Sequence, residues 1–180
     1  MKATGIVRRI DDLGRIVIPK EIRRTLRIRE GDPLEIFTDR EGKVILKKYS
    51  PIGELGTLAG IYADSLSKTL DCTVCITDTD QVIAAAGNGK KELQEMLLSA
   101  ELAEVFQERK TVLKKSSDAE FVAITKDRSE YSEEIISVIL SEGDIAGGVI
   151  FLQKNEKKHF GEMEKKFAAG AADLLGGQLS

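Results

Sequence analysis

The sequence contains no tryptophan, a single histidine and only two cysteines among its 180 residues. So little thiol and imidazole excludes a disulfide-stabilised scaffold and a histidine-rich metal site. Long apolar runs are missing as well: the longest, residues 145–152, is far shorter than the roughly 18 residues that a membrane-spanning helix requires. Because no apolar signal region follows Met1 either, we expect a cytoplasmic protein.

Positive charge is concentrated at the N-terminal end, although the whole chain has a net charge of −3. Residues 1–50 contain 13 Lys and Arg against 8 Asp and Glu, a balance of +5, while the rest of the chain contains 14 against 22, a balance of −8. A basic head on an acidic body is typical of a protein that binds a polyanion through one domain and uses the other for a different task. Chance clustering of charge is the simpler alternative.

A domain boundary is expected near residue 50. Residues 49–54 (YSPIGE) interrupt the periodic patterns on either side with a proline and a glycine. With 42% hydrophobic and 32% charged residues, the chain has enough apolar material for folded globular domains. We therefore predict a first domain over residues 1–50, a linker over residues 51–55 and a second domain over residues 56–180.

In the first domain, alternating apolar residues predict β-strands and one short helix. The strands are expected at residues 3–10 and 14–19, around a turn at residues 11–14, and at residues 33–39 and 43–49, around a turn at residues 40–42. Pro19 suits the first turn of a helix because it has no N–H to donate. A helix over residues 20–26 should therefore follow it.

The second domain reads as helix, antiparallel sheet, helix, which predicts an α+β sandwich. The expected elements are a helix over residues 55–70, a hairpin of residues 72–78 and 81–87, a helix over residues 92–108, short strands at residues 111–115 and 121–125, two long strands within residues 133–153 that fold back at residues 142–144, and a helix from about residue 160. Any ligand pocket should lie between the sheet and the crossing residues 88–133.

The first domain is too small to be stable alone, because below about 70–80 residues a core rarely supplies more than about 3–5 kcal/mol. Without a disulfide or a metal, a second copy of the chain is the remaining source of stability. Ile16 and Ile18 share one face of the expected strand, and Ile22 and Leu26 share one side of the expected helix. The arginines then project from other faces, and two paired copies would join them into one cationic surface. Guanidinium groups bind phosphate bidentately and read guanine edges, which favours DNA as the ligand.

A simpler interpretation explains the same arginines without DNA. In it, Arg23 and Arg27 only solvate the helix surface. The other arginines pair with nearby carboxylates: Arg8, Arg9 and Arg15 with Asp11, Asp12 and Glu21. Spacing alone favours neither interpretation.

Residues 4–49 combine paired arginines, the core Gly-Arg-Ile-Val-Ile-Pro at residues 14–19 and the strand opener Gly-Asp-Pro-Leu-Glu at residues 31–35. In these residues the chain resembles the swapped-hairpin DNA-binding domain of the AbrB family of transition-state regulators. The resemblance implies an all-β swapped-hairpin fold, an intertwined homodimer, and binding to A/T-rich double-stranded DNA through backbone contacts and DNA deformability. It implies DNA contacts by Arg8, Arg15, Arg23 and Arg24, with Arg9, Lys20 and Arg27 as further candidates.

The second domain resembles a GAF domain, a small-molecule sensing fold, in its order of elements and in residues 77–87 (TDTDQVIAAAG). This implies no known cofactor; a small-molecule ligand would be unidentified, and its binding residues are unknown. The two domains together resemble sporulation regulators of the AbrB family, which implies activation and repression of sporulation genes in the forespore. Apolar stripes on the helix over residues 55–70 and on the terminal helix either pack on the sheet or bundle with another copy, which would join two dimers into a homotetramer.

Three signals for other chemistry are set aside. Cys72 and Cys75 have redox or zinc spacing, but residues three apart on a strand face opposite sides, so buried structural cysteines are expected. Residues 87–91 (GNGKK) lack the spacing of a phosphate-binding loop and predict a turn. His159 has no nucleophile or carboxylate constellation and is expected at a solvated helix start. The sequence therefore predicts no catalytic residues, no metal site and no enzyme.

These features together predict a cytoplasmic DNA-binding transcription regulator that makes no contact with a membrane, with a C-terminal domain for sensing or assembly. One rival is an antitoxin-type autoregulator, which would carry a disordered tail after the DNA-binding domain. The other rival is a sensor whose basic head docks an acidic protein partner and does not bind DNA.

Overall fold

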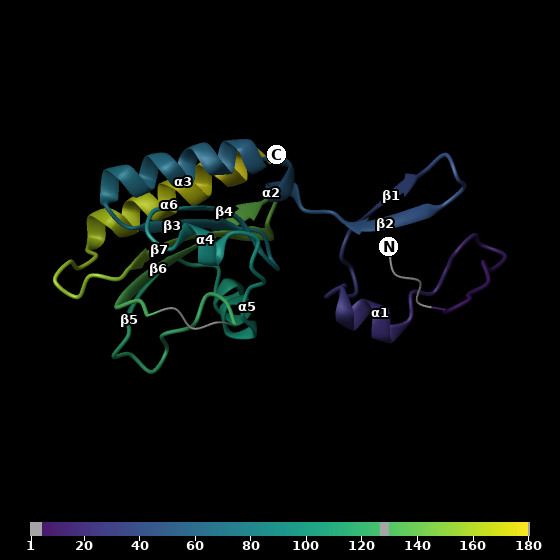
Figure 1. Ribbon diagram of the computed structural model, residues 1–180, viewed down its shortest axis with the longest axis horizontal. Coiled ribbons are helices and arrows are strands. Elements are labelled where there is room, and N and C mark those ends of the chain that lie inside the picture. Colours follow the sequence, from purple (N-terminus) through teal and green to yellow (C-terminus); the bar gives the residue numbers. More distant parts are fainter. Residues whose placement is uncertain (1–4, 127–129, 180) are drawn as a thin grey trace. The chain divides into compact units, whose positions relative to one another are not determined.

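The computed structural model describes residues 5–126 and 130–179 (Figure 1). The chain divides into two compact units, and the boundary in the sequence falls between Tyr49 and Ser50. Within the described residues, each helix is too short or too polar to cross a membrane. The first unit carries α1 (Lys20–Thr25), β1 (Leu34–Thr38) and β2 (Val44–Lys48).

The β1–β2 hairpin confirms the expected pair of strands. Its strands are antiparallel, with Leu34 opposite Lys48 and Thr38 opposite Val44. The Asp39 carboxylate closes the turn by accepting hydrogen bonds from the backbone N–H groups of Glu41 and Lys43, both at 2.9 Å. The short helix after Pro19 is also confirmed, as α1.

The expected strand pair at residues 3–10 and 14–19 is wrong for a single chain. Residues 5–10 and 15–19 form no strand, and only the turn between them is present, where the Asp11 N–H donates to the Arg15 carbonyl at 3.0 Å. Residues 3 and 4 lie outside the described part of the chain. A strand needs a neighbour for its backbone groups, and one chain supplies none to these residues.

Large apolar side chains remain exposed throughout the first unit, and α1 buries none of its residues. Eleven of the 17 large apolar side chains exposed in the described part of the chain belong to this unit: Ile6, Val7, Ile10, Leu13, Ile16, Val17, Leu26, Ile36, Phe37, Val44 and Ile45. A stable monomer rarely exposes so much apolar surface in so few residues. The first unit of one chain therefore exposes the apolar surface expected of half a domain.

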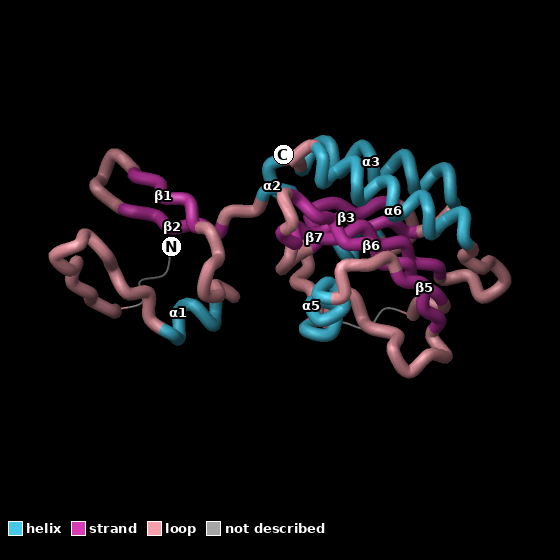
Figure 2. The backbone as a smooth tube through the Cα atoms, turned by 180° about the vertical axis from the view of Figure 1, so that it is seen from behind, coloured by secondary structure: helices cyan, strands magenta, loops and turns pink. Residues whose placement is uncertain are grey.

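The second unit is a three-layer α+β sandwich, as expected (Figure 2). Its antiparallel sheet has the strand order β4-β3-β7-β6-β5. The strands are β3 (Thr73–Thr77), β4 (Val82–Ala86), β5 (Val112–Lys115), β6 (Glu133–Ser141) and β7 (Asp144–Gln153), and the helices are α2 (Pro51–Glu54), α3 (Gly56–Leu70), α4 (Lys90–Leu93), α5 (Ala100–Gln107) and α6 (Glu162–Gly177).

Alternation along the strands produces two apolar cores, one on each face of the sheet. Val74 and Ile76 pack in the first core with α3 and α6, whereas Cys75 packs in the second core with α5. The layers approach closely: a Cβ on Gly148 of β7 would lie 2.7 Å from the Phe106 ring of α5. A residue with a side chain at position 148 would therefore force the helix away from the sheet.

Residues 51–55, expected as a linker, instead carry α2. Ser50 caps this helix, since its hydroxyl accepts from the Gly53 N–H at 3.0 Å and donates to the Asp78 carboxylate at 2.8 Å. Ile52 is fully buried in the first core. The proline and glycine that predict a break thus begin a short helix that belongs to the second unit.

The expected helix over residues 92–108 is wrong in its middle. α4 ends at Leu93 and α5 begins only at Ala100. Between them the Gln94 side chain bonds the free edge of β4, accepting from the Ala85 N–H at 3.0 Å and donating to the Ile83 carbonyl at 2.8 Å. Residues 121–125 likewise form no full strand, only one isolated bridge from Thr125 to Leu98. The spacing of apolar residues alone does not distinguish a helix from a loop that covers the edge of a sheet.

Candidate functional site

The turn at residues 11–15 fixes one predicted DNA contact, Arg15. The Asp11 carboxylate accepts from the backbone N–H groups of Leu13 at 3.1 Å and Arg15 at 2.7 Å, and from the Arg15 guanidinium at 2.8 Å. Gly14 has φ +76°, a left-handed conformation that glycine adopts without strain. Hydrogen bonds from the Arg15 backbone and guanidinium lower the pKa of Asp11, so this carboxylate stays ionised. The Arg15 side chain is nevertheless 70% exposed.

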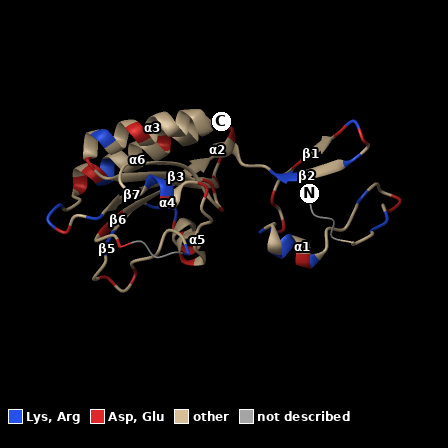
Figure 3. Ribbon diagram, viewed as in Figure 1, with Lys and Arg blue, Asp and Glu red and all other residues tan. Residues whose placement is uncertain are grey.

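The other predicted contacts lie on the surface around this turn and on α1 (Figure 3). Lys20, Arg23 and Arg24 are exposed on α1, and Arg8 and Arg9 are exposed before the turn. These four arginines make no ion pair with any residue that the structure describes. Of the pairings with carboxylates that the simpler interpretation proposes, the described residues therefore contain only the one between Arg15 and Asp11.

Arg27 differs from the other candidates. It follows α1, has φ +53° and is half-buried, and its carbonyl accepts from the Lys48 ammonium at 3.4 Å. The same ammonium pairs with Asp32 at 3.0 Å, and Asp32 also accepts from the Arg29 N–H at 2.8 Å. Carboxylates of the first unit thus close turns and leave the guanidiniums of α1 unneutralised.

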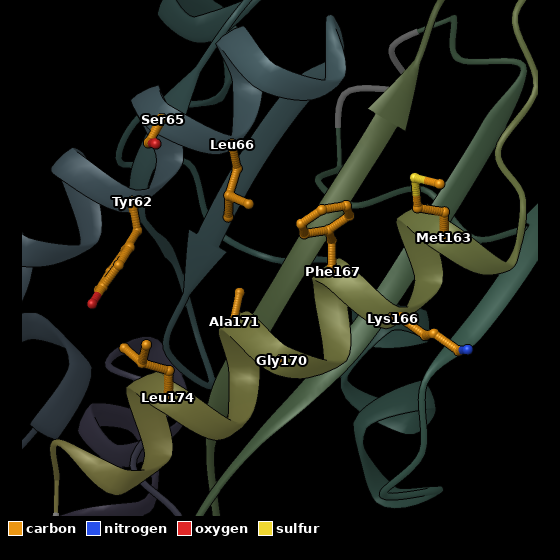
Figure 4. Close-up of a pocket in the computed structure, with 9 residues that line it drawn as sticks. All are labelled: Tyr62, Ser65, Leu66, Met163, Lys166, Phe167, Gly170, Ala171 and Leu174. Atoms are coloured by element: carbon orange, nitrogen blue, oxygen red, sulfur yellow. The ribbon is translucent and has the colours of Figure 1, made fainter.

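The second unit has an apolar groove of about 490 Å³ between the outer sides of α3 and α6 (Figure 4). It is lined by Tyr62, Ser65, Leu66, Met163, Lys166, Phe167, Gly170, Ala171 and Leu174. The face of α6 that packs on the sheet is a different one, with Ala168, Ala172 and Leu175. Met163 is 67% exposed and Phe167 is 42% exposed, so the predicted apolar stripe of α6 exceeds what the sheet covers.

The groove between α3 and α6 does not lie between the sheet and residues 88–133, where a ligand pocket is expected. Side chains of α5 and of residues 121–124 fill that space as the second core. The second described hollow, of about 240 Å³, is polar and lies instead where β3, β4 and β7 end near Asp71 and Lys158.

Both cysteines are buried and unpaired with each other, and they face opposite sides as expected. Burial raises the pKa of each thiol to about 12, which removes the thiolate needed for redox chemistry. His159 is exposed just before α6, as expected, but the sequence missed its carboxylate partner: its Nδ1 lies 2.7 Å from the carboxylate of buried Glu133, which also accepts from the Phe160 N–H at 2.7 Å.

Sequence reasoning also missed a buried charged pair, Glu134 and Lys114. The sequence signal for it was the Glu133-Glu134 dipeptide at the start of an apolar strand. Adjacent strand residues face opposite sides of a sheet, so when both faces of the strand are covered, each face receives one of the two glutamates. Among the residues described, no cluster of three or more His, Cys, Asp or Glu side chains is arranged to hold a metal ion.

Comparison with known proteins assigns relatives to both units. A family model described as "Stage V sporulation protein T C-terminal, transcription factor" matches residues 54–180, and one described as "Antidote-toxin recognition MazE, bacterial antitoxin" matches residues 7–54. Stage V sporulation protein T of Bacillus subtilis (strain 168) is 50% identical over 99% of both chains. Transition state regulatory protein AbrB of the same organism is 67% identical over 28% of this chain and 52% of its own length. The PixJ GAF domain of Thermosynechococcus elongatus, at 13% identity, superposes on 73% of this chain and 88% of its own with a TM-score of 0.57, which shows a GAF fold.

Proposed function

The chain belongs to the stage V sporulation protein T family of transcription factors, and we propose that it regulates sporulation genes by binding double-stranded DNA through a dimer of its first unit. The observation that carries this proposal is the coincidence, in one small unit, of exposed unneutralised arginines and exposed apolar side chains. The arginines suit a polyanion, and the apolar side chains suit a second copy. A transcription regulator of this kind acts in the cytoplasm, here that of the forespore, and is not an enzyme.

The dimer supplies what one chain lacks. Residues 5–10 and 15–19 are rich in β-branched apolar side chains, which favour strands, but have no strand beside them. Interleaving with the same residues of a second copy gives their backbone groups partners and covers side chains such as Val7 and Val17. Pairing also doubles the number of guanidiniums on one surface. The all-β swapped-hairpin fold, which the resemblance of residues 4–49 to the AbrB family implies, would have that arrangement.

The contacts with DNA are assigned to Arg8, Arg15, Arg23 and Arg24, with Arg9, Lys20 and Arg27 as additional contacts. Arginines on a turn and on a short helix reach phosphates and groove edges from two directions. The resemblance to the AbrB family implies A/T-rich DNA, and contacts made mostly with the backbone fit selection of such DNA by its deformability. Asp11 orients the Arg15 guanidinium and leaves most of it exposed.

Binding of DNA is tested with Arg24→Ala against Arg40→Ala as a matched control. Both arginines are exposed, but Arg40 lies on the β1–β2 turn, outside the assigned surface. In gel-shift titrations on an A/T-rich duplex at graded salt, Arg24→Ala should weaken binding at least about fivefold and reduce the salt slope by about 1 for each lost phosphate contact. Arg40→Ala should bind as the parent does. Parent-like affinity and slope in Arg24→Ala, with the dimer intact by sedimentation, would remove Arg24 from the interface.

The second unit is assigned to sensing and assembly. The groove between α3 and α6 suits the same groove of another copy, because it is apolar and its Met163, Phe167 and Leu174 side chains are left exposed (Figure 4). Packing of four such helices would join two dimers into a tetramer with two DNA-binding surfaces, which increases avidity for DNA that carries paired sites. A small-molecule ligand of the GAF-like unit remains unidentified.

Assembly is tested with Phe167→Glu and with Leu97→Glu as control, since both residues are exposed and apolar but only Phe167 lines the groove. Phe167→Glu should sediment as a dimer and Leu97→Glu as a tetramer, because a carboxylate in a dry helix interface lacks hydration. A Phe167→Glu variant that still forms tetramers would exclude this groove as the interface.

The two rivals make different predictions. An antitoxin-type regulator would carry a disordered tail, whereas residues 50–126 and 130–179 form the folded second unit. Limited proteolysis of an antitoxin should leave only the first unit, while the present assignment expects both units to resist. A protein-docking sensor would fail to shift any A/T-rich duplex at low salt.

A further inference from the structure

Lys114 and Glu134 are direct cross-strand neighbours that are buried together on one face of the sheet. They lie opposite each other in the β5–β6 ladder. Lys114 is 6% exposed and Glu134 is 0% exposed, and both lie on the side of the second core, as do their strand neighbours Val112 and Ile136. Two opposite charges so deeply buried are unusual unless each is hydrogen-bonded.

Glu134 and Lys114 both form hydrogen bonds with backbone groups of one segment. We call residues 116–126, which follow β5 and cross the second core, the cover segment. The Glu134 carboxylate accepts from the Val122 N–H at 3.1 Å, and the Lys114 ammonium donates to the Glu120 carbonyl at 2.9 Å. Ser99 adds uncharged ties, donating its hydroxyl to the Ala123 carbonyl at 2.5 Å and its N–H to the Ile124 carbonyl at 3.0 Å.

The Glu134 carboxylate is only partly compensated. Its second oxygen, Oε2, is buried without a hydrogen-bond partner in the part of the chain that the structure describes. On β7 the residue opposite is Leu152, which offers no charge, and the Glu120 side chain of the cover segment is exposed. Lys114 is thus the charged group that faces Glu134 among the described residues. Glu133, Lys115 and His159 form a separate cluster around the next strand position, which faces the other side of the sheet.

Burial raises the pKa of Glu134 to about 7, although the Val122 N–H and the Lys114 ammonium act in the opposite direction. The carboxyl group is therefore poised between its neutral and ionised forms near neutral pH. When the cover segment lifts, water reaches the carboxyl group and its pKa returns toward the ordinary 4.5. Ionisation consequently favours the lifted state, and protonation favours the closed state.

We propose that Glu134 and Lys114 form a proton-controlled latch, which keeps the cover segment closed over the second core in mildly acidic conditions and loosens it as the pH rises through neutrality. Lys114 sets the pH range of the latch, because its charge partly stabilises the carboxylate in the closed state. The uncharged ties from Ser99 keep the closed state dominant at all these pH values. Opening uncovers the apolar side chains Phe121, Val122 and Ile124, which otherwise pack against the second core.

Hydrogen exchange of the full-length protein tests the latch. Amide exchange of residues 118–126 is measured at about pH 6 and about pH 8 and corrected for the intrinsic chemical rate at each pH. The change in pKa between the two states implies that the opening constant rises about tenfold over this range. Glu134→Gln, which keeps an acceptor for the Val122 N–H but does not titrate, should abolish the rise. Lys114→Met should move it to higher pH.

Glu133→Gln is the matched control, because it makes the same substitution at the adjacent residue on the opposite face of the sheet. It should keep the tenfold rise of the parent. Amides of β3 report global unfolding, and their opening constant should be smaller than that of the cover segment at both pH values. A pH-independent opening constant in the parent, or a parent-like rise in Glu134→Gln, would overturn the proposal, and so would a cover segment that opens no more readily than β3.

Discussion

Removing the Ile52 side chain should destabilise the second unit, although the sequence predicts that residue 52 lies in a linker. The Ile52 side chain is fully buried, with a relative exposure of 0%, and it packs in the first core from α2. Replacing a buried isoleucine with alanine removes three methyl or methylene groups and leaves a cavity, which costs about 2–5 kcal/mol. We expect about 3 kcal/mol for Ile52→Ala and about 1 kcal/mol for Ile52→Val.

Urea denaturation followed by far-ultraviolet circular dichroism measures this effect, because the two longest helices, α3 and α6, belong to the second unit. The transition midpoint should fall without a change in m-value, and the melting temperature should fall by about 10 °C for Ile52→Ala. Ile61→Ala is the control, since Ile61 is 61% exposed on α3 and its loss should change stability by less than about 0.5 kcal/mol.

The reasoning would be refuted if Ile52→Ala were as stable as Ile61→Ala. That result would mean that α2 does not pack on the second unit in solution. It would also restore the linker that the proline and glycine of residues 49–54 predict. A graded loss from Ile52→Val to Ile52→Ala is the signature of a packed side chain, because each removed carbon contributes separately.

Two further predictions concern buried titratable groups. Burial raises the pKa of Glu133, but hydrogen bonds from the Phe160 N–H and from His159, with the nearby Lys115 charge, lower it below its ordinary value of 4.5. The stability that this carboxylate contributes is therefore present above pH 4.5 and is lost as the pH falls through the lowered pKa. The difference in unfolding free energy between the parent and Glu133→Gln should consequently shrink on acidification. A difference that stays constant with pH would contradict this prediction. Cys72 and Cys75, with thiol pKa values of about 12, should not react with a disulfide reagent near pH 8 until denaturant unfolds the second unit, and rapid labelling of the native protein would refute their burial.

Much of the architecture follows from local patterns in the sequence. The apolar runs around turn residues in residues 72–87 and 133–153 predict the strands β3, β4, β6 and β7, and the opposite facing of strand residues three apart correctly separates Cys72 from Cys75. The sequence also predicts the helix after Pro19 and the hairpin around residues 39–43. Prolines and turn residues constrain the backbone only within a few positions, so their effect can be read locally. The paired arginines and the core motif at residues 14–19 identify the family of the first unit.

The errors share a different cause. Residues 94–99 and 121–125 have the composition of regular elements, but the Gln94 side chain and one bridge to Thr125 replace them. His159 is exposed, as its sequence neighbours predict, but the fold brings the carboxylate of Glu133, 26 residues earlier in the chain, to 2.7 Å from its ring. Such contacts depend on which distant strand lies alongside, and no local pattern encodes that distance.

The sequence by itself determined the two-part division of charge, the period of each strand and helix, and the motifs of the first unit, because each of these depends on residues a few positions apart. Only the tertiary structure decided that α2 joins the second unit, which apolar stripe of α6 stays uncovered, and that Lys114 and Glu134 face each other in the second core. These outcomes depend on the register between strands and on which faces compete for burial. Both are properties of the assembled sheet, so they are absent from any single segment of the chain.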